Sequence, residues 1–182
     1  MKKVIYFCVL VSILIIAGFS TACVGRTVHL GISNAANERL MAELASLLII
    51  ERTGSTVQID VYKDSNELYK AIKQGNVNVF FESPLHAAEM VGKPKDSPYD
   101  QIKREYRTKF NLTWLELFGG STKYGPVLTS ETLSTYPALP KLLNKLSGAL
   151  VNDTYAKLLK SVESPDKTKK VAKDFLKGKK LI

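Results

Sequence analysis

The chain has 182 residues, two cysteines and a formal net charge of +9. Loss of an N-terminal export signal leaves roughly 160 residues, enough for one domain that buries about two thirds of its unfolded surface but too few for two full domains. Because Cys8 lies in the removable segment, Cys23 has no partner within the chain. The fold must therefore depend on its core and not on a disulfide.

The N-terminus has the pattern of an export signal. Two lysines precede an apolar run over residues 4–19, which is shorter than the roughly 20 residues of a membrane-spanning helix. The run ends in the tetrapeptide STAC, which resembles a bacterial lipobox with Ser at a position that is usually Leu. We therefore predict a lipoprotein signal peptide over residues 1–22 and a lipid on Cys23. Ordinary cleavage before Cys23, without lipid, is the alternative.

The first part of the mature chain alternates between β-rich runs and helical periodicity. Apolar residues recur at helical spacing up to Gly54, and Asp64 with Glu67 forms a candidate capping box for a second helix. The predicted elements are a strand over 27–32, a helix up to Gly54, a strand over 57–62, a helix from Asp64 to Gly75 and a strand over 77–81.

The second part continues this alternation after a surface loop over residues 92–98. The predicted elements are a polar helix over 99–110, a strand over 112–118 and helices over 137–146, 153–162 and 165–176. Strands that alternate with helices predict an α/β fold with a mostly parallel sheet flanked by helices. In such a fold the ligand crevice lies beyond the carboxyl ends of the strands.

Much of the positive charge is near the C-terminus. No RNA-binding aromatic motif or recognised DNA-binding pattern accompanies it, so we predict a solvated helix face and no nucleic-acid partner. In a lipid-anchored protein this face would also be attracted to anionic headgroups, by about 1 kcal/mol per well-placed lysine. The residues are Lys167, Lys169, Lys170, Lys173, Lys177, Lys179 and Lys180.

Three strand-to-helix connections are candidates for the ligand site. After the first strand, SNAANE supplies Asn34 and Asn37 next to a helix N-terminus, where free N–H groups and amide side chains can hold a polar ligand group. Simple helix capping is the alternative for both asparagines. After the third strand, ESPLH supplies Glu82, which could neutralise a cation, and Ser83, which could orient it. Equally, Glu82 could be an acid favoured by the dipole of the following helix.

The third connection, GGSTKYG, supplies Tyr124 as the best-placed aromatic side chain for a quaternary ammonium group, since each ring face contributes about 0.5–2 kcal/mol. The strand aromatics fit a packed core better. His86 lies near Glu82, but no second cluster of His or Cys accompanies it, so we predict neither a metal site nor acid/base catalysis. The expected core aromatics are Phe80, Phe81, Trp114 and Phe118.

The order of these segments resembles a known family. The stretches that carry the resemblance are ISNAANERLMAELASLLIIERTGSTVQIDVYKDSNELYKAIKQGNVNVFFES, YDQIKREYRTKFNLTWLELFGGSTKYG and PVLTSETLSTYPALPKLLNKLSGALVNDTYAKLLKSVESPDKTKKVAKDFLKGKKLI. They resemble the substrate-binding proteins of ABC importers for glycine betaine, choline and related osmoprotectants, which have the type II periplasmic-binding-protein fold. The resemblance implies an ABC permease as partner and a quaternary ammonium solute as ligand.

The resemblance also shows that a segment is missing. Members of the family insert a second lobe of about 100 residues, the size of a small domain, between the outgoing and returning hinge strands. Here GGSTKYG connects the two strands directly, and it includes Lys123 where a cationic ligand would bind. We therefore predict a single α/β lobe over residues 23–182, with an outgoing segment over 27–119 and a returning segment over 126–182.

The expected function is that of an exported, membrane-anchored lipoprotein that binds an osmoprotectant weakly, or that completes its cleft with a second polypeptide or a second copy. Micromolar binding needs about 8 kcal/mol and millimolar binding about 4 kcal/mol. The loss of half of the surface that encloses the ligand could lower the affinity across that gap. The alternative is an accessory lipoprotein that docks to a partner and binds no small molecule. An enzyme is not expected, because the chain lacks a nucleophile–base arrangement, a phosphate loop and metal-ligand spacing, and no cofactor is expected.

Overall fold

The structure is a computed structural model that describes residues 27–33, 35–162 and 164–182. The predicted signal peptide over 1–22, Cys23 and Asn34 lie outside these ranges. Within them, no helix combines the length and the apolar character needed to cross a bilayer.

Five strands form one sheet in the order β2-β1-β3-β5-β4. Their bounds are β1 (Val28–Ser33), β2 (Val57–Tyr62), β3 (Val79–Glu82), β4 (Leu112–Trp114) and β5 (Gly125–Thr129). β1 pairs in parallel with β2 and β3, whereas β5 runs antiparallel to both of its neighbours, β3 and β4. Only β5 is therefore reversed, which confirms the mostly parallel sheet.

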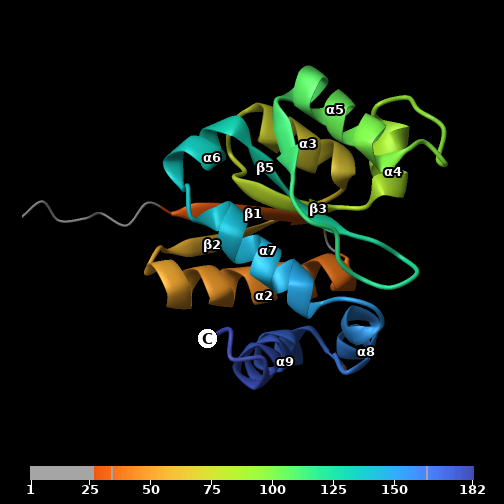
Figure 1. The fold of residues 1–182 in the computed structure, drawn as a ribbon. Coiled ribbons are helices and arrows are strands. Elements are labelled where there is room, and N and C mark those ends of the chain that lie inside the picture. The colour runs from red at the N-terminus through yellow and green to blue at the C-terminus, as the bar shows by residue number, and fades with distance from the viewer. Residues whose placement is uncertain (1–26, 34, 163) are drawn as a thin grey trace, which may run out of the picture.

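Helices cover both faces of this sheet (Figure 1). α3, α4 and α5 lie on one side and α2 and α7 on the other, with α9 packed against α2. This arrangement confirms the predicted α/β class. The helices are α2 (Ala36–Thr53), α3 (Ser65–Lys73), α4 (Pro84–Met90), α5 (Tyr99–Phe110), α6 (Ser130–Thr135), α7 (Leu139–Ala149), α8 (Thr154–Lys160) and α9 (Pro165–Gly178).

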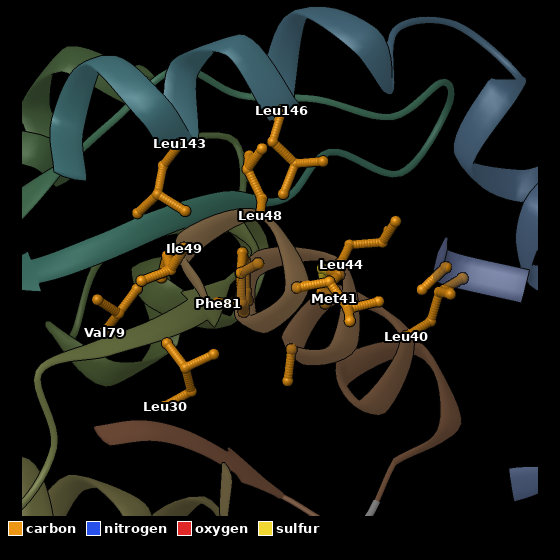
Figure 2. Packing of buried hydrophobic residues seen from close by; sticks show 14 of the residues in the cluster. Leu30, Leu40, Met41, Leu44, Leu48, Ile49, Val79, Phe81, Leu143 and Leu146 are labelled. Atoms are coloured by element: carbon orange, nitrogen blue, oxygen red, sulfur yellow. The ribbon is translucent and has the colours of Figure 1, made fainter. Parts of the chain in front are cut away.

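The core between the sheet and α2 is aliphatic. Leu44 and Leu48 of α2 are fully buried, and they pack with side chains from β1, β3 and α7 (Figure 2). Successive residues of a strand point to opposite faces, so Val79 and Phe81 belong to this core while Phe80 belongs to the other. The expected burial of Phe80, Phe81, Trp114 and Phe118 is confirmed.

On the other face, α3 approaches β1 closely at Gly31. A Cβ atom at this position would lie 2.6 Å from Leu68 Cδ1 and 2.8 Å from Val77 Cγ1, so only glycine fits under the helix. α3 itself begins at the predicted cap, since the Asp64 side chain accepts a hydrogen bond from the Glu67 N–H at 3.0 Å.

The sequence prediction was wrong at several element ends. α2 has Ala35 as its N-cap residue with no side-chain cap, so Asn37 lies in the first turn and does not cap the helix. β4 stops at Trp114 instead of residue 118, because Pro126 of the facing strand β5 has no N–H to continue the ladder. α9 includes Gly178, which was expected beyond its end.

A tight turn joins the outgoing and returning strands. Phe118 and Tyr124 form an antiparallel bridge, with N–H to O distances of 2.8 and 3.0 Å in the two directions, so residues 119–123 make the whole connection. Gly119 has φ +93°, and a Cβ atom there would overlap the carbonyl oxygen of Thr122. The turn therefore requires glycine at its first residue.

Candidate ligand cleft

The three candidate connections meet at one end of the sheet, which we call the cleft end. β1 and β3 are parallel neighbours, so Ser33 and Glu82 close their strands at the same edge. Glu82 also pairs with Gly125, which brings the turn over residues 119–123 to this edge. α4, α8 and the N-terminal end of α2 lie on this side of the molecule (Figure 1).

Asn37 and Tyr124, two predicted site residues, are in contact. Asn37 Nδ2 donates a hydrogen bond to the Tyr124 hydroxyl at 3.3 Å. Tyr155, from the first turn of α8, donates its hydroxyl to the Asn37 carbonyl oxygen at 2.8 Å. The rings of Tyr124 and Tyr155 lie edge to face with centroids 5.8 Å apart. Three segments distant in sequence are thus tied together at the cleft end.

These two tyrosines belong to an aromatic wall. The Phe118 ring centroid lies 5.4 Å from that of Tyr155, 6.3 Å from that of Tyr124 and 6.4 Å from that of Phe81. Phe118 and Tyr155 are buried, whereas Tyr124 is half-buried and forms the accessible part of the wall. A half-exposed ring backed by buried rings is suited to contact a cation without collapsing.

A carboxylate lies beside this wall. Glu38, half-buried in the first turn of α2, accepts hydrogen bonds from the N–H and the hydroxyl of Ser33. Burial, followed by the neighbouring Tyr124 and Glu38, raises the pKa of Tyr155 far above its usual value. The Tyr155 hydroxyl therefore stays protonated and serves as a donor, and Glu38 supplies negative charge close to the rings.

Glu82 is only 7% exposed, and its oxygens already have partners. Oε1 accepts the N–H of Ser83 at 2.7 Å, and Oε2 accepts the Tyr69 hydroxyl and contacts His86 Nδ1, each at 2.8 Å. The Tyr69 hydroxyl is also hydrogen bonded to that of Tyr106. Glu82 therefore organises the base of the β3–α4 connection, and its direct role toward a ligand stays a prediction.

Ser83 and His86 hold the start of α4. Ser83 is the N-cap residue, and its hydroxyl accepts the His86 N–H at 3.2 Å. The hydrogen bond to Glu82 is the main cause that raises the pKa of His86, against the opposing effect of burial, and Glu89 and Glu38 raise it further. These contacts make His86 a structural residue of this loop.

The side chain of Lys123 contacts the backbone of its own turn. Its Nζ donates to the carbonyl oxygen of Gly119 at 2.8 Å. This hydrogen bond ties the side chain of Lys123 to the first residue of the turn.

A small pocket opens between the turn and α8. Its volume is about 160 Å³, and its lining includes Thr122, Tyr124, Asp153 and Tyr155. Sites that enclose a small molecule usually have about 300–1,000 Å³. Larger hollows of about 350 and 430 Å³ lie along β4 and α5 and beside the end of β5, away from the aromatic wall. The cleft end thus has a small, open pocket beside the aromatic wall and does not enclose a volume of that size.

Sequence reasoning missed two residues at the cleft end, Tyr155 of the aromatic wall and Glu38 beside it. Tyr155 lies in a predicted helix, and no local pattern distinguishes it from a core aromatic residue. Glu38 has the spacing of a first-turn acid, and only its contact with Ser33 shows that it faces the cleft end. Among the described residues, no group of three or more His, Cys, Asp or Glu could hold a metal ion.

Comparisons with known proteins agree with this architecture. Residues 26–132 match the family described as the substrate-binding domain of the ABC-type glycine betaine transport system. Apo YehZ from Escherichia coli superposes with a TM-score of 0.75 at 13% identity, over 86% of this chain and 99% of that one. A glycine betaine/carnitine/choline ABC transporter structure gives 0.73 at 12% identity, over 86% and 98%. At such identities these structures show the fold alone. No curated protein sequence matches the chain.

Proposed function

Since the chain belongs to the family of substrate-binding domains of ABC-type glycine betaine transport systems, we propose that it binds a quaternary ammonium or related osmoprotectant solute as one half of a cleft. The observation that carries this proposal is the contact of Asn37, Tyr124 and Tyr155 at the cleft end. Ring faces attract a cation that cannot donate hydrogen bonds, and Glu38 adds the opposite charge.

The strength of binding follows from how little is enclosed. Each ring face contributes about 0.5–2 kcal/mol and a solvent-exposed ion pair about 1 kcal/mol or less, so an accessible face with a nearby carboxylate supplies no more than the 4 kcal/mol of a millimolar complex and falls far short of the 8 kcal/mol of a micromolar one. The small pocket volume of about 160 Å³ supports the same conclusion. Tight binding therefore needs a second wall.

Exposed apolar side chains at the cleft end support a partner that supplies this wall. Leu85, in the first turn of α4, is 55% exposed, and Val151, which bridges to Gly119, is 45% exposed. Both border the connections that meet there. A second polypeptide or a second copy of the chain would cover them while it closes the cleft, and the ABC permease is the further partner that the family implies.

The site and its partner dependence are tested by calorimetric titration of choline, glycine betaine and carnitine into the purified chain over a range of protein concentrations. We expect millimolar affinity when the chain is dilute and tighter binding as self-association or an added partner sets in. Tyr124→Leu should weaken binding about tenfold, as expected for about 1.4 kcal/mol from one ring. Phe175→Leu in α9 removes a remote ring and is the matched control. Tight one-to-one binding by a monomer would contradict the half-cleft.

An accessory role without a solute is the second candidate, and the exposure of Leu85 and Val151 also favours it. In this case the cleft end is a docking surface only. Co-purification of a permease with no change of the thermal unfolding midpoint on addition of any of the three solutes would select it. A solute-dependent shift that Tyr124→Leu abolishes would reject it.

We further propose that the chain is exported and anchored through a lipid on Cys23. The signal-like segment and the lipobox-like tetrapeptide support this, as does the family, whose substrate-binding proteins work outside the cytoplasm. The intact mass of the protein extracted from membranes is the test. A mass without an acyl modification would contradict the anchor and leave the solute proposal standing.

A further inference from the structure

We propose that the free edge of the sheet at β4 binds an acidic, extended segment of another polypeptide, which adds to the sheet as a further strand. The proposal goes beyond the proposed solute binding and depends neither on it nor on the lipid anchor. We call the site the edge groove. It is formed by α5 and β4 and is defined by Lys103, Arg104, Arg107, Leu112, Thr113 and Trp114.

The backbone of β4 has groups that point away from the sheet. β4 is the last strand in the strand order and lies next to β5. The N–H of Leu115 donates to the Pro126 carbonyl oxygen at 2.9 Å, so Leu115, and Thr113 two residues before it, face β5. Because the hydrogen-bonding direction alternates along an antiparallel pair, the N–H and C=O groups of Leu112 and Trp114 point to the free edge. An added strand could pair with these groups.

A hollow of about 350 Å³ lies along this edge, between β4 and α5. Its volume is within the range of about 300–1,000 Å³ that is usual for ligand sites. Leu112 and Trp114 line it from the sheet, and both side chains are buried. The indole nitrogen of Trp114, Nε1, has no hydrogen-bond partner among the described residues. This edge therefore retains a buried donor that a carbonyl or carboxylate oxygen of a bound segment would stabilise.

The wall that α5 contributes to the edge groove is cationic. Arg107 follows Lys103 by four residues and Arg104 by three, so the three side chains lie on one face of the helix. Lys103 forms an ion pair with Asp100 at 2.7 Å. Within the described part of the chain, the guanidinium groups of Arg104 and Arg107 form neither an ion pair nor a hydrogen bond. Two available arginines beside a strand edge attract carboxylates, so the segment that binds there is acidic.

The alternative is that these cations only protect the edge from unwanted pairing. Protective charges usually lie on the edge strand itself. The three residues of β4 are Leu112, Thr113 and Trp114 and carry no charge, whereas the cations lie on α5 and leave the hollow between them and the strand open. The position of the charges therefore favours selection of an acidic strand over protection of the edge.

Charge also restricts what the added strand can be. A second copy that paired its β4 antiparallel to this one would continue the sheet with both α5 helices on the same face, so the arginines of the two copies would repel each other. Residues 1–26 of the chain contain two lysines, one arginine and neither Asp nor Glu, so they do not match the cationic wall. The occupant is therefore an acidic segment of a different polypeptide.

The test uses the purified chain and two end-capped heptapeptides as probes. One peptide alternates Glu and Thr, and the other has Gln in place of Glu. Trp114 is the chain's single tryptophan, so its fluorescence reports occupancy of the edge groove. We expect a saturable change with the acidic peptide and a much weaker one with the neutral peptide. No saturable change with the acidic peptide, or equal affinity for the two peptides, would overturn the proposal.

Charge reversal tests the cationic wall. Arg104→Glu combined with Arg107→Glu should lower the affinity for the acidic peptide about tenfold, as for the loss of two exposed ion pairs. The matched variant combines Lys157→Glu with Lys160→Glu, two exposed cations with the same spacing on α8, far from α5 (Figure 1). It should keep most of the affinity. Equal loss in the two variants would show that net charge, and not the edge groove, attracts the peptide.

Amide hydrogen exchange distinguishes strand addition from attraction by charge alone. With the acidic peptide bound, the N–H groups of Leu112 and Trp114 should exchange at least about tenfold more slowly, because they acquire a partner. The N–H of Thr113 faces β5 already and should change little. Unchanged exchange at Leu112 and Trp114, or protection at the other edge strand, β2, would overturn the proposal.

Methylated peptides test the same pairing from the side of the ligand. Two isomers of the acidic peptide carry N-methyl groups on either the Glu or the Thr amides. Only one of these two sets can face β4, so one isomer should lose binding while the other keeps it. Equal affinity of the two isomers would overturn strand addition. These measurements follow the edge groove and not the cleft end, so their failure would leave the solute proposal standing.

Discussion

Different kinds of side chain pack on the two faces of the sheet. The face toward α2, α7 and α9 is packed with aliphatic side chains, most of them completely buried. The face toward α3, α4 and α5 has a buried polar chain in its core, from Tyr106 through Tyr69 to Glu82 and on to His86. The first face depends mainly on packed volume, apart from the aromatic wall at its cleft end, whereas the second also contains a buried glutamate and a histidine whose protonation matters. The difference indicates that one face supports stability and the other positions the β3–α4 connection at the cleft end.

The largest expected effect is on the aliphatic face. Leu44 is fully buried in the centre of α2, so Leu44→Ala removes methyl groups and leaves a cavity. We expect the free energy of unfolding to fall by about 2–5 kcal/mol, with little dependence on pH. Denaturant unfolding measures this. A loss below about 1 kcal/mol would show that the α2 core can collapse, and that the faces differ less than their composition suggests.

The polar face should respond to a smaller chemical change. Tyr69→Phe keeps the ring but deprives the buried Glu82 and Tyr106 of a hydrogen-bond partner. We expect a loss of about 1–3 kcal/mol in the free energy of unfolding, because a buried polar group is left unsatisfied. Tyr99→Phe is the matched control, since it loses one bond to the Leu115 carbonyl oxygen at a half-buried site. Equal effects of the two variants would remove the special role of the buried chain.

The pH dependence of stability should also come from the polar face. The pKa of His86 is raised in the folded protein, so its contribution is fully present below the unfolded value of about 6.5 and is lost as pH rises through the raised pKa. Because the side chain is about one third exposed, we expect the contribution to stay below about 1 kcal/mol. In unfolding measurements across this range, His86→Gln should flatten the slope, whereas Leu44→Ala should keep it. A slope unchanged in His86→Gln would assign it elsewhere.

The smallest effect is expected where the polar face meets water. Glu89 and Lys95 form an exposed ion pair at 2.7 Å, which lowers the pKa of Glu89. Exposed pairs are screened by solvent, so Glu89→Gln should leave the denaturation midpoint unchanged within error. A loss comparable to that of Tyr69→Phe would show that charge, and not burial, distinguishes this face.

The fold could be predicted where the hydrophobic periodicity of a segment agrees with the turn and capping residues at its ends. β2 begins and ends at the predicted residues, Val57 and Tyr62, because its alternation is bounded by turn signals. α5 likewise matches its predicted range, and its buried residues are Ile102 and Tyr106. Local sequence failed where a partner decided the outcome, as at β4, whose length depends on Pro126 in another strand. α6 has only six residues and was missed, since its N-cap residue, Thr129, is also the last residue of β5.

The candidate site shows the same division. The α/β pattern and the predicted strand ends were sufficient to predict that three residues lie at one edge of the sheet. They are Asn37, Glu82 and Tyr124. These patterns could not show that Glu82 is enclosed by Tyr69 and His86, nor that Tyr155 joins the wall from a helix far along the chain. Those facts depend on packing between distant segments, which no single stretch of sequence contains.

The turn over residues 119–123 has a consequence for protein engineering. The backbone groups of Phe118 and Tyr124 at its base are hydrogen bonded to each other, so the sheet is complete before the turn begins. A guest domain with neighbouring termini can therefore be spliced in between them without stretching the host. The turn is therefore a suitable site for domain insertion, and an inserted binding domain would lie beside the aromatic wall of the host.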